Sequence, residues 1–387
     1  MPQFLICLLA VIAVSLSGCQ SPRKQDSARA PITTTPQARA PVYDNKAPKR
    51  THKVALLLPL TGRSSGLGQA MLQSAQMSLF DNPDSGLELM VRDTQGNPQV
   101  AAQAATDAIN QGAQLILGPL FANAAQSVAA TAQMRNIPVL SFSNNSSISG
   151  PTLFTMGFAP RDQIQVLLET AASHGMTRIG ALVPKSSYGD VIRGELERHA
   201  RAMGISLDLV MGYQPGTSDF TQQATTISTS GIDALIIPEG GQQLRLMVSS
   251  LVYHNVNLNN VRLLGTGQWD TNDVFEEPLL QKGWYVAAPR DQRQKFEQRY
   301  RQQYHLAPPR LATLPYDAIS LAALLARTNA NAGMNPFDTR FLTQERGFTG
   351  IDGMFRLHRD GSVQRGLTVL EVGPGRLKTI APPPRGF

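Results

Sequence analysis

Cysteine is almost absent from this chain, and aromatic and charged residues are scarce. The 387 residues include two cysteines (Cys7 and Cys19), 6 % aromatic residues and 16 % charged residues. Two cysteines at one end exclude a disulfide framework for the rest of the chain. A hydrophobic content of 42 % is typical of a globular protein rather than a disordered one. The length is too great for one compact core and predicts two lobes.

A basic stripe is also missing, although the net charge is +7 and the isoelectric point about 9.6. Eight basic and two acidic residues lie between Gln20 and Lys53, so that segment alone carries +6. The remainder of the chain carries only about +1 and is nearly neutral. Nucleic-acid binding needs cations placed along a phosphate backbone, so we exclude nucleic acid as a partner.

The sequence contains no constellation of catalytic residues. Its six histidines are not paired at metal-ligand spacing, and no cysteine follows Cys19 in the chain to complete a thiolate site. The glycine-rich stretch from Gly62 to Gly68 lacks the Gly-Lys-Ser/Thr of a phosphate-binding loop. No Gly-x-Ser-x-Gly nucleophile elbow is present. We therefore expect a protein that is not an enzyme and that binds no metal or cofactor.

The N-terminus predicts export and lipidation. Residues 4–16 form an almost unbroken apolar run, too short to span a membrane and typical of a signal peptide. The following Leu16-Ser17-Gly18-Cys19 resembles the lipobox of bacterial lipoproteins, which implies a signal peptide over residues 1–18 and acylation of Cys19. Gln20 is not the Asp that retains many lipoproteins in the inner membrane, which favours the outer membrane. The alternative is a short N-terminal core helix with an incidental cysteine.

Residues 19–52 are rich in Pro, Ala, Thr, Arg and Lys and nearly free of aromatic residues. Such a composition buries too little apolar surface to become ordered, so we expect a flexible basic tether.

From Val54 onward, short apolar runs alternate with helical stretches. The expected strands are 54–60, 87–92, 115–117, 139–142, 178–183, 206–213, 234–237, 262–265 and 284–287. The expected helices are 68–80, 99–111, 124–135, 161–174, 190–203, 242–254, 294–305 and 314–328. Strands that are apolar throughout and alternate with helices predict α/β lobes with doubly wound parallel sheets, joined by a hinge.

The pattern loosens near residues 159–163 and 289–292, which predicts where the chain passes between lobes. We assign residues 53–160 and 289–345 to the first lobe, and residues 161–288 and 346–387 to the second. In the last segment, residues 354–357, the turn Arg359-Asp360-Gly361 and residues 367–372 predict a β-hairpin.

An ordered series of short motifs resembles the type I periplasmic binding proteins of the leucine/isoleucine/valine-binding kind. The motifs are residues 54–62 followed by Gly68, Arg92-Asp93-Thr94, Gly112-Ala113, residues 117–120, residues 137–141, Tyr188-Gly189-Asp190 and Tyr316-Asp317-Ala318. The resemblance covers roughly residues 53–375. It implies two hinged lobes, a periplasmic location and a small amino-acid-like ligand.

Residues 56–62, 118–120 and 184–190 resemble more narrowly the lipoprotein activators of penicillin-binding proteins. This resemblance implies a lipid-anchored regulator that docks on a peptidoglycan synthase. Those activators often carry an additional helical-repeat domain, and this chain has only the expected tether in its place. The alternative is an amino-acid receptor whose partner is an ABC permease.

Ligands of open α/β sheets bind outside the carboxyl ends of the strands, and in a hinged pair these ends line the cleft. The family's serine for the ligand carboxylate and its acid for the ligand amine are missing after Gly118 and Gly265. The candidate cleft residues that remain are Ser141, Ser143, Asn144, Asn145, Tyr188, Glu239 and Gln268. We therefore expect a cleft of altered or lost specificity.

Cys19 generates the first testable prediction. Cys19→Ser should abolish labelling by a radioactive or alkyne-tagged fatty acid and move the protein from the membrane to the soluble fraction, because the acyl chains supply the membrane affinity. Cys7→Ser is the matched control and should leave both measurements unchanged. Membrane association that survives Cys19→Ser would refute lipidation at this position.

Overall fold

The computed structural model describes residues 51–329 and 333–387. The expected signal peptide, Cys19 and all of the tether except its last two residues lie outside this range. One of those two, His52, is the first residue of a strand and pairs with Leu87. No helix in the described ranges is long and apolar enough to span a bilayer.

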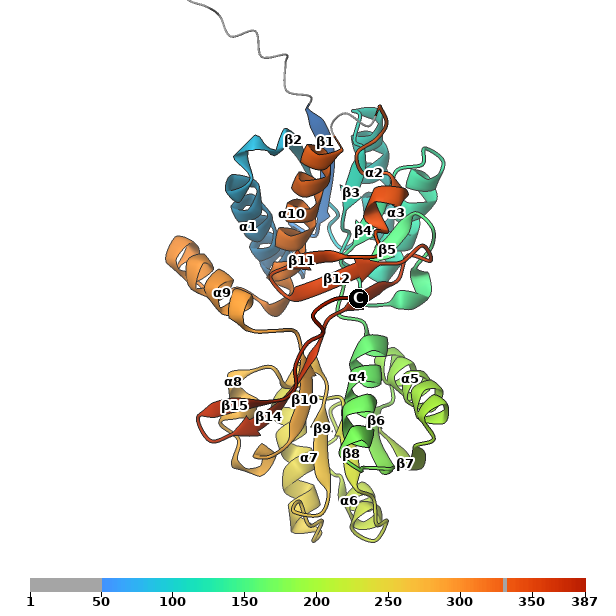
Figure 1. Ribbon diagram of the computed structural model, residues 1–387, viewed down its shortest axis with the longest axis vertical. Coiled ribbons are helices and arrows are strands. Elements are labelled where there is room, and N and C mark those ends of the chain that lie inside the picture. The colour runs from blue at the N-terminus through green and yellow to red at the C-terminus, as the bar shows by residue number, and fades with distance from the viewer. Residues whose placement is uncertain (1–50, 330–332) are drawn as a thin grey trace, which may run out of the picture. The chain divides into compact units, whose positions relative to one another are not determined.

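The first lobe is built on a sheet of five parallel strands in the order β2-β1-β3-β4-β5 (Figure 1). These strands are β1 (His52–Leu58), β2 (Leu87–Asp93), β3 (Leu115–Leu117), β4 (Val139–Ser141) and β5 (Leu153–Thr155). The helices are α1 (Ser65–Asp81), α2 (Pro98–Asn110), α3 (Ala122–Gln133), α9 (Asp291–Tyr304), α10 (Thr313–Thr328) and α11 (Thr339–Leu342). Helices α1 and α10 share one apolar core with the sheet, and α2 and α3 share another.

The second lobe has seven strands in the order β15-β14-β10-β9-β8-β6-β7. These strands are β6 (Arg178–Pro184), β7 (Ser206–Tyr213), β8 (Ala234–Ile237), β9 (Arg262–Gly265), β10 (Trp284–Ala287), β14 (Thr368–Gly373) and β15 (Arg376–Ala381). The helices are α4 (Pro160–Ser173), α5 (Ser187–Met203), α6 (Thr221–Ser228), α7 (Gly241–Tyr253) and α8 (Asn272–Phe275). Five strands are parallel, and β14 and β15 add antiparallel pairs at one edge.

Local sequence explains why these elements form. In α2, Ala101, Ala104, Ala105 and Ala108 recur at helical spacing and are all buried, so small side chains bring the helix close to the sheet. The helix begins at the Asn97 cap, whose side-chain oxygen accepts hydrogen bonds from two backbone N–H groups. Every expected strand and helix is present, with bounds shifted by no more than three residues. The expected α/β fold with two lobes is confirmed.

The last part of the chain differs from the expectation. The strand β12 (Gly353–Leu357) pairs with β11 (Phe348–Gly350) and β13 (Val363–Arg365), not with residues 367–372. The predicted hairpin partner is therefore wrong. The true partner, β13, is not indicated by the sequence because it is only three residues long and leaves little trace in the hydrophobic pattern. Residues 368–373 instead pair with β10 and β15.

The small β11-β12-β13 sheet packs on the first lobe rather than on the second. Phe348, Phe355, Leu357 and Val363 lie in the same apolar core as α1 and α10. Beyond β15, the Phe387 ring lies under the Arg356 guanidinium of this sheet, 4.9 Å from ring centroid to Cζ. The chain therefore crosses between the lobes at residues 156–159, 288–290 and 366–367, and it returns toward the first lobe after β15.

Leu357 tests this placement. It is 1 % exposed within the core of the first lobe, so Leu357→Ala should lower the free energy of unfolding by about 2–5 kcal/mol. Thr349→Ala, at an exposed position of β11, is the control and should change stability by less than about 0.5 kcal/mol. Urea denaturation followed by far-UV circular dichroism measures both. Equal stability of the two variants would contradict the packing described above.

Candidate functional site at the hinge

A cavity of about 410 Å³ lies at the crossovers between the lobes. Its wall includes Asn144 of the first lobe, and Tyr188 and Gln268 of the second. The remaining lining residues are Phe158, Ala159, Asp162, Gln163, Gly267, Asp270, Thr271, Val286, Ala287, Ala288, Arg310, Arg365 and Leu367. A cavity of this size, with residues from both lobes, is large enough for a small organic molecule.

Three of the seven expected cleft residues line this cavity. The Tyr188 hydroxyl lies 3.5 Å from Thr266 Oγ1, and burial raises the pKa of Tyr188. Gln268 donates through Nε2 to the Pro238 carbonyl, at 3.2 Å, and is otherwise exposed. Asn144 is exposed at the cavity wall. Each of the three therefore retains polar atoms that can contact a ligand.

The other four expected residues make hydrogen bonds within the protein. Ser141 Oγ donates to the Pro119 carbonyl at 2.9 Å and accepts from Ser143 N at 3.1 Å. Ser143 Oγ in turn accepts from the Asn145 backbone N–H, at 3.1 Å.

Asn145 and Glu239 are engaged in the same way. Asn145 Oδ1 accepts hydrogen bonds from the backbone N–H and the hydroxyl of Ser147. Glu239 accepts from the Tyr213 hydroxyl at 2.6 Å and from the Gly240 N–H at 3.1 Å. None of these four residues belongs to the lining of the hinge cavity, so their role in ligand binding stays a prediction.

The loop after β9 reaches the cavity because Gly265 and Trp269 pack tightly. A Cβ atom on Gly265 would lie 2.1 Å from the Trp269 ring, so only glycine fits there. Trp269 is fully buried and donates from its ring nitrogen to the Ile237 carbonyl at 3.1 Å. Gln163 Oε1 accepts from Gly267 N at 2.8 Å. These contacts fix the positions of Gln268 and Asp270 at the cavity.

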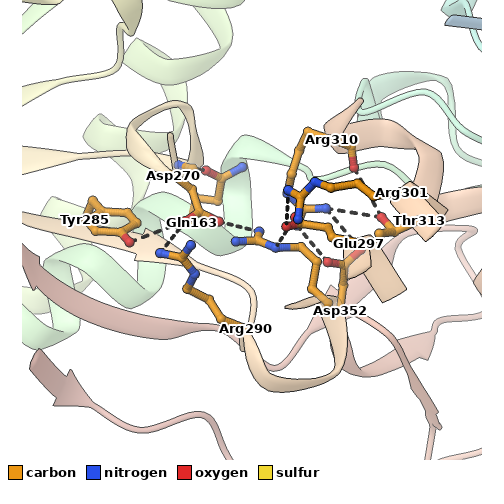
Figure 2. A network of polar contacts seen from close by, with 11 residues as sticks. Gln163, Asp270, Tyr285, Arg290, Glu297, Arg301, Arg310, Thr313 and Asp352 are labelled. Atoms are coloured by element: carbon orange, nitrogen blue, oxygen red, sulfur yellow. Dashed lines mark hydrogen bonds and ion pairs between the residues drawn. The ribbon is translucent and has the colours of Figure 1, made fainter. Parts of the chain in front are cut away.

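A network of buried ion pairs connects the lobes beside the cavity (Figure 2). Asp270 of the second lobe is 2 % exposed and pairs with Arg293 of α9, which is 3 % exposed. Arg290 Nη1 lies 3.6 Å from Asp270 Oδ1. Arg293 also pairs with Glu297, its Nε lying 3.5 Å from Glu297 Oε1. Burial would lower the pKa of Arg293, but the hydrogen bond and the charge of Asp270 outweigh it and raise that pKa.

A second group of charges holds the first lobe to the crossovers. Arg310 Nη2 lies 2.8 Å from Oδ1 of the buried Asp352, and the Arg310 guanidinium covers the Phe158 ring at 4.1 Å. Arg365 is 4 % exposed; its guanidinium lies over the rings of Phe158 and Phe355 and donates to the Met156 carbonyl. Burial alone would raise the pKa of Asp352, but Arg310 and Arg365 outweigh it and lower that pKa.

Local sequence patterns do not indicate most of the charged residues of the hinge. Of the thirteen further lining residues, only those near 159–163 were signalled, through the loss of strand–helix alternation. Arg310 and Arg365 lie about 150 and 200 residues after the first crossover, and no local pattern connects them to it. No group of three or more His, Cys, Asp or Glu side chains within residues 51–329 and 333–387 is arranged to hold a metal ion.

Comparison with known proteins supports a single family. Residues 51–376 match the family model described as periplasmic binding protein. The chain belongs to the periplasmic binding protein family. Membership in this family implies a periplasmic location.

Solved structures of this family share the fold. A substrate-binding protein of an ABC transporter from Sphaerobacter thermophilus superposes with a TM-score of 0.70 at 16 % identity, over 86 % of this chain and 97 % of the other. A branched-chain amino acid binding protein of Streptococcus pneumoniae, in complex with isoleucine, gives 0.62 at 16 % identity over 86 % and 100 %. A solute-binding protein of Rhodopseudomonas palustris, in complex with 3,4-dihydroxybenzoic acid, gives 0.64 at 17 % identity over 87 % and 97 %.

Two relatives are detectable by sequence. An uncharacterized protein of Rickettsia prowazekii is 21 % identical over an alignment of 239 positions, which covers 59 % of this chain and 63 % of the relative. An uncharacterized protein of Methanocaldococcus jannaschii is 20 % identical over an alignment of 280 positions, which covers 67 % of this chain and 66 % of the relative. The periplasmic binding protein described here thus matches less than two thirds of the length of either relative.

Asp317 gives the stability of the folded protein a dependence on pH. Burial and the neighbouring Asp352 charge raise the pKa of Asp317 from 3.8 to about 7, while Asp317 Oδ1 accepts from Ile351 N at 2.7 Å. The folded protein therefore binds this proton more tightly than the unfolded chain does. Its stabilising effect is complete below about pH 4 and is lost as the pH rises through 7.

The amide side chain of the Asp317→Asn variant has no titrating proton. We therefore expect the free energy of unfolding of this variant to increase relative to that of the wild type as the pH rises from 5 to 8. Urea titrations at several pH values measure the difference. Asp219→Asn is the control: hydrogen bonds with Thr221 lower the pKa of Asp219, so its difference from the wild type should be flat over this range. A flat difference for Asp317→Asn as well would contradict the raised pKa.

Proposed function

We propose that this periplasmic binding protein is not an enzyme and binds a small organic ligand in the hinge cavity between its lobes. The observation that carries the proposal is the cavity of about 410 Å³, whose wall joins Asn144 of one lobe to Tyr188 and Gln268 of the other. A ligand that contacts both lobes has a higher affinity for one relative arrangement of the lobes than for the others. It therefore shifts the balance between open and closed forms.

The composition of the cavity supports an organic ligand of mixed polarity. Apolar atoms come from Phe158, the strand end at Val286–Ala288 and Leu367, while hydroxyl and amide groups come from the opposite side chains. Pockets for small molecules commonly combine an apolar wall with a few polar groups that set orientation. The structural relatives in complex with isoleucine and with 3,4-dihydroxybenzoic acid support a ligand of this size. A receptor role beside an ABC permease is the function that these relatives favour.

Activation of a peptidoglycan synthase is the second candidate. It rests on the motifs that resemble lipoprotein activators, including residues 184–190 at the start of α5. The internal hydrogen bonds of Ser141, Ser143, Asn145 and Glu239 favour it, because a dedicated amino-acid receptor would keep several of these groups free. In this role the lobes dock on a penicillin-binding protein from a lipid anchor at Cys19, at the outer rather than the inner membrane.

A thermal-shift screen of amino acids, aromatic acids, amides and peptidoglycan fragments tests ligand binding. A true ligand at 100 times its Kd should stabilise the protein by about 2.7 kcal/mol. Gln268→Ala should weaken its binding, because Gln268 lies on the cavity wall. Gln242→Ala, at an exposed position of α7 outside the cavity, is the matched control.

Two outcomes would overturn the proposal. If no compound of the panel stabilises the protein, the cavity is not a solute site. If a compound binds equally well to the wild type and to the Gln268→Ala variant, its site lies elsewhere. Stimulation of a purified penicillin-binding protein by this protein without any added ligand would favour the second candidate.

A further inference from the structure

Four charged side chains line the hinge cavity, and three of them already have partners. Asp270 is held by Arg293 and Arg290. Arg310 makes two contacts with the Asp352 carboxylate, at 2.8 and 3.2 Å. The Arg365 guanidinium is enclosed between two aromatic rings and faces the charges of Asp352 and Asp317. The fourth charged residue, Asp162, makes no ion pair with any described residue.

Asp162 lies in the first turn of α4 and is 9 % exposed. Its Oδ2 accepts one hydrogen bond, from the Arg365 backbone N–H at 3.0 Å. Its Oδ1 has no hydrogen-bond partner among the described residues, although the residue forms part of the cavity wall. This oxygen is not enclosed by protein atoms, so it can accept a hydrogen bond from water or from a ligand in the cavity.

The charged groups around Asp162 compensate its charge only in part. Arg161 and Arg365 lower the pKa of Asp162, while Glu195 of α5 raises it; in the cavity, Arg310 and Asp270 are paired elsewhere. Burial is the largest effect and raises the pKa of Asp162 to about 6. At neutral pH the ionised Asp162 carboxylate therefore has no ion-pair partner among the described residues.

We propose that Asp162 binds the protonated amine of the ligand, and that this ligand is a small amine with an apolar body that needs no free carboxylate. The inference rests on the proposed function of the cavity. The apolar body fits against Phe158, Val286 and Leu367. The Ser141 hydroxyl, which a ligand carboxylate would need, already donates to the Pro119 carbonyl, and neither Ser141 nor Ser143 lines the cavity.

Binding of an amine to Asp162 depends on pH in a defined direction. A protonated Asp162 offers no negative charge to an ammonium group, so it must release its proton before the amine binds. Affinity therefore rises as the pH increases from 5 to 7 and levels off above the pKa of Asp162. A ligand recognised through a carboxylate gains nothing from this ionisation.

Three compounds with the same isobutyl body test the inference by calorimetry. L-leucinamide carries only the amine charge, 4-methylpentanoate carries only the carboxylate charge, and L-leucine carries both. We expect leucinamide to bind at least about tenfold more tightly than 4-methylpentanoate, the order of one charge-assisted hydrogen bond. Its affinity should rise from pH 5 to pH 7.

Asp162→Asn supplies the decisive comparison. The amide oxygen of Asn can still accept from Arg365 N, so the contact that holds α4 is kept while the charge is removed. This variant should lose the preference for leucinamide and its pH dependence. Asp190→Asn, an exposed acid of α5 outside the cavity, is the matched control and should behave like the wild type.

The outcomes separate this inference from the proposed function. Equal or tighter binding of 4-methylpentanoate overturns the amine assignment while the cavity remains a ligand site. Unchanged leucinamide binding to Asp162→Asn does the same. If that variant does not fold, a wild-type leucinamide affinity that is constant from pH 5 to pH 7 overturns the inference. Failure of all three compounds to bind the wild type refutes the amine site, and the proposed function then depends on the wider screen.

Discussion

The Arg365 side chain joins the segments on which the relation between the two lobes depends. Arg365 lies at the end of β13, where the chain leaves the first lobe; its side chain contacts Met156 and Phe158 at the first crossover, and its backbone N–H donates to Asp162. Removing a cation from water is expensive. Two aromatic faces and the negative charges of Asp352 and Asp317 offset this cost in part, and burial still lowers the pKa of Arg365. The hinge is therefore held by charge rather than by a continuous apolar core.

This constraint decides which groups are left for a ligand. Each buried charge of the hinge needs compensation, so Asp352 is taken by Arg310, and Asp270 by Arg293. Asp270 and Arg310 also line the cavity, so these two charged side chains are already paired within the folded protein before a ligand binds. Asp162 is the exception, since its one strong contact comes from a backbone N–H. Specificity in this cavity thus depends on few side chains.

The sequence predicted the elements of the fold much better than the site. The short apolar run Leu115–Leu117 indicates a buried strand, and the alanines of α2 recur at helical spacing. Strands and helices could therefore be located from local sequence patterns alone. The contact between Asp162 and Arg365 joins residues 203 positions apart, and no local pattern records it. Ser141 and Ser143 were correctly placed at the carboxyl end of a strand. The Ser141 hydroxyl, however, donates to Pro119 in the loop after β3, and the Ser143 hydroxyl accepts from Asn145 in its own loop.

The distribution of tryptophan has a spectroscopic consequence. The chain has two tryptophans, Trp269 and Trp284, and both lie in the second lobe. Trp269 directly follows the cavity residue Gln268. Trp284 lies in β10 and donates from its ring nitrogen to Glu371 Oε2 of β14 at 2.9 Å. Tryptophan emission therefore reports on one lobe, while far-UV circular dichroism reports on both. Non-coincident unfolding curves from these two signals would reveal that the lobes melt separately.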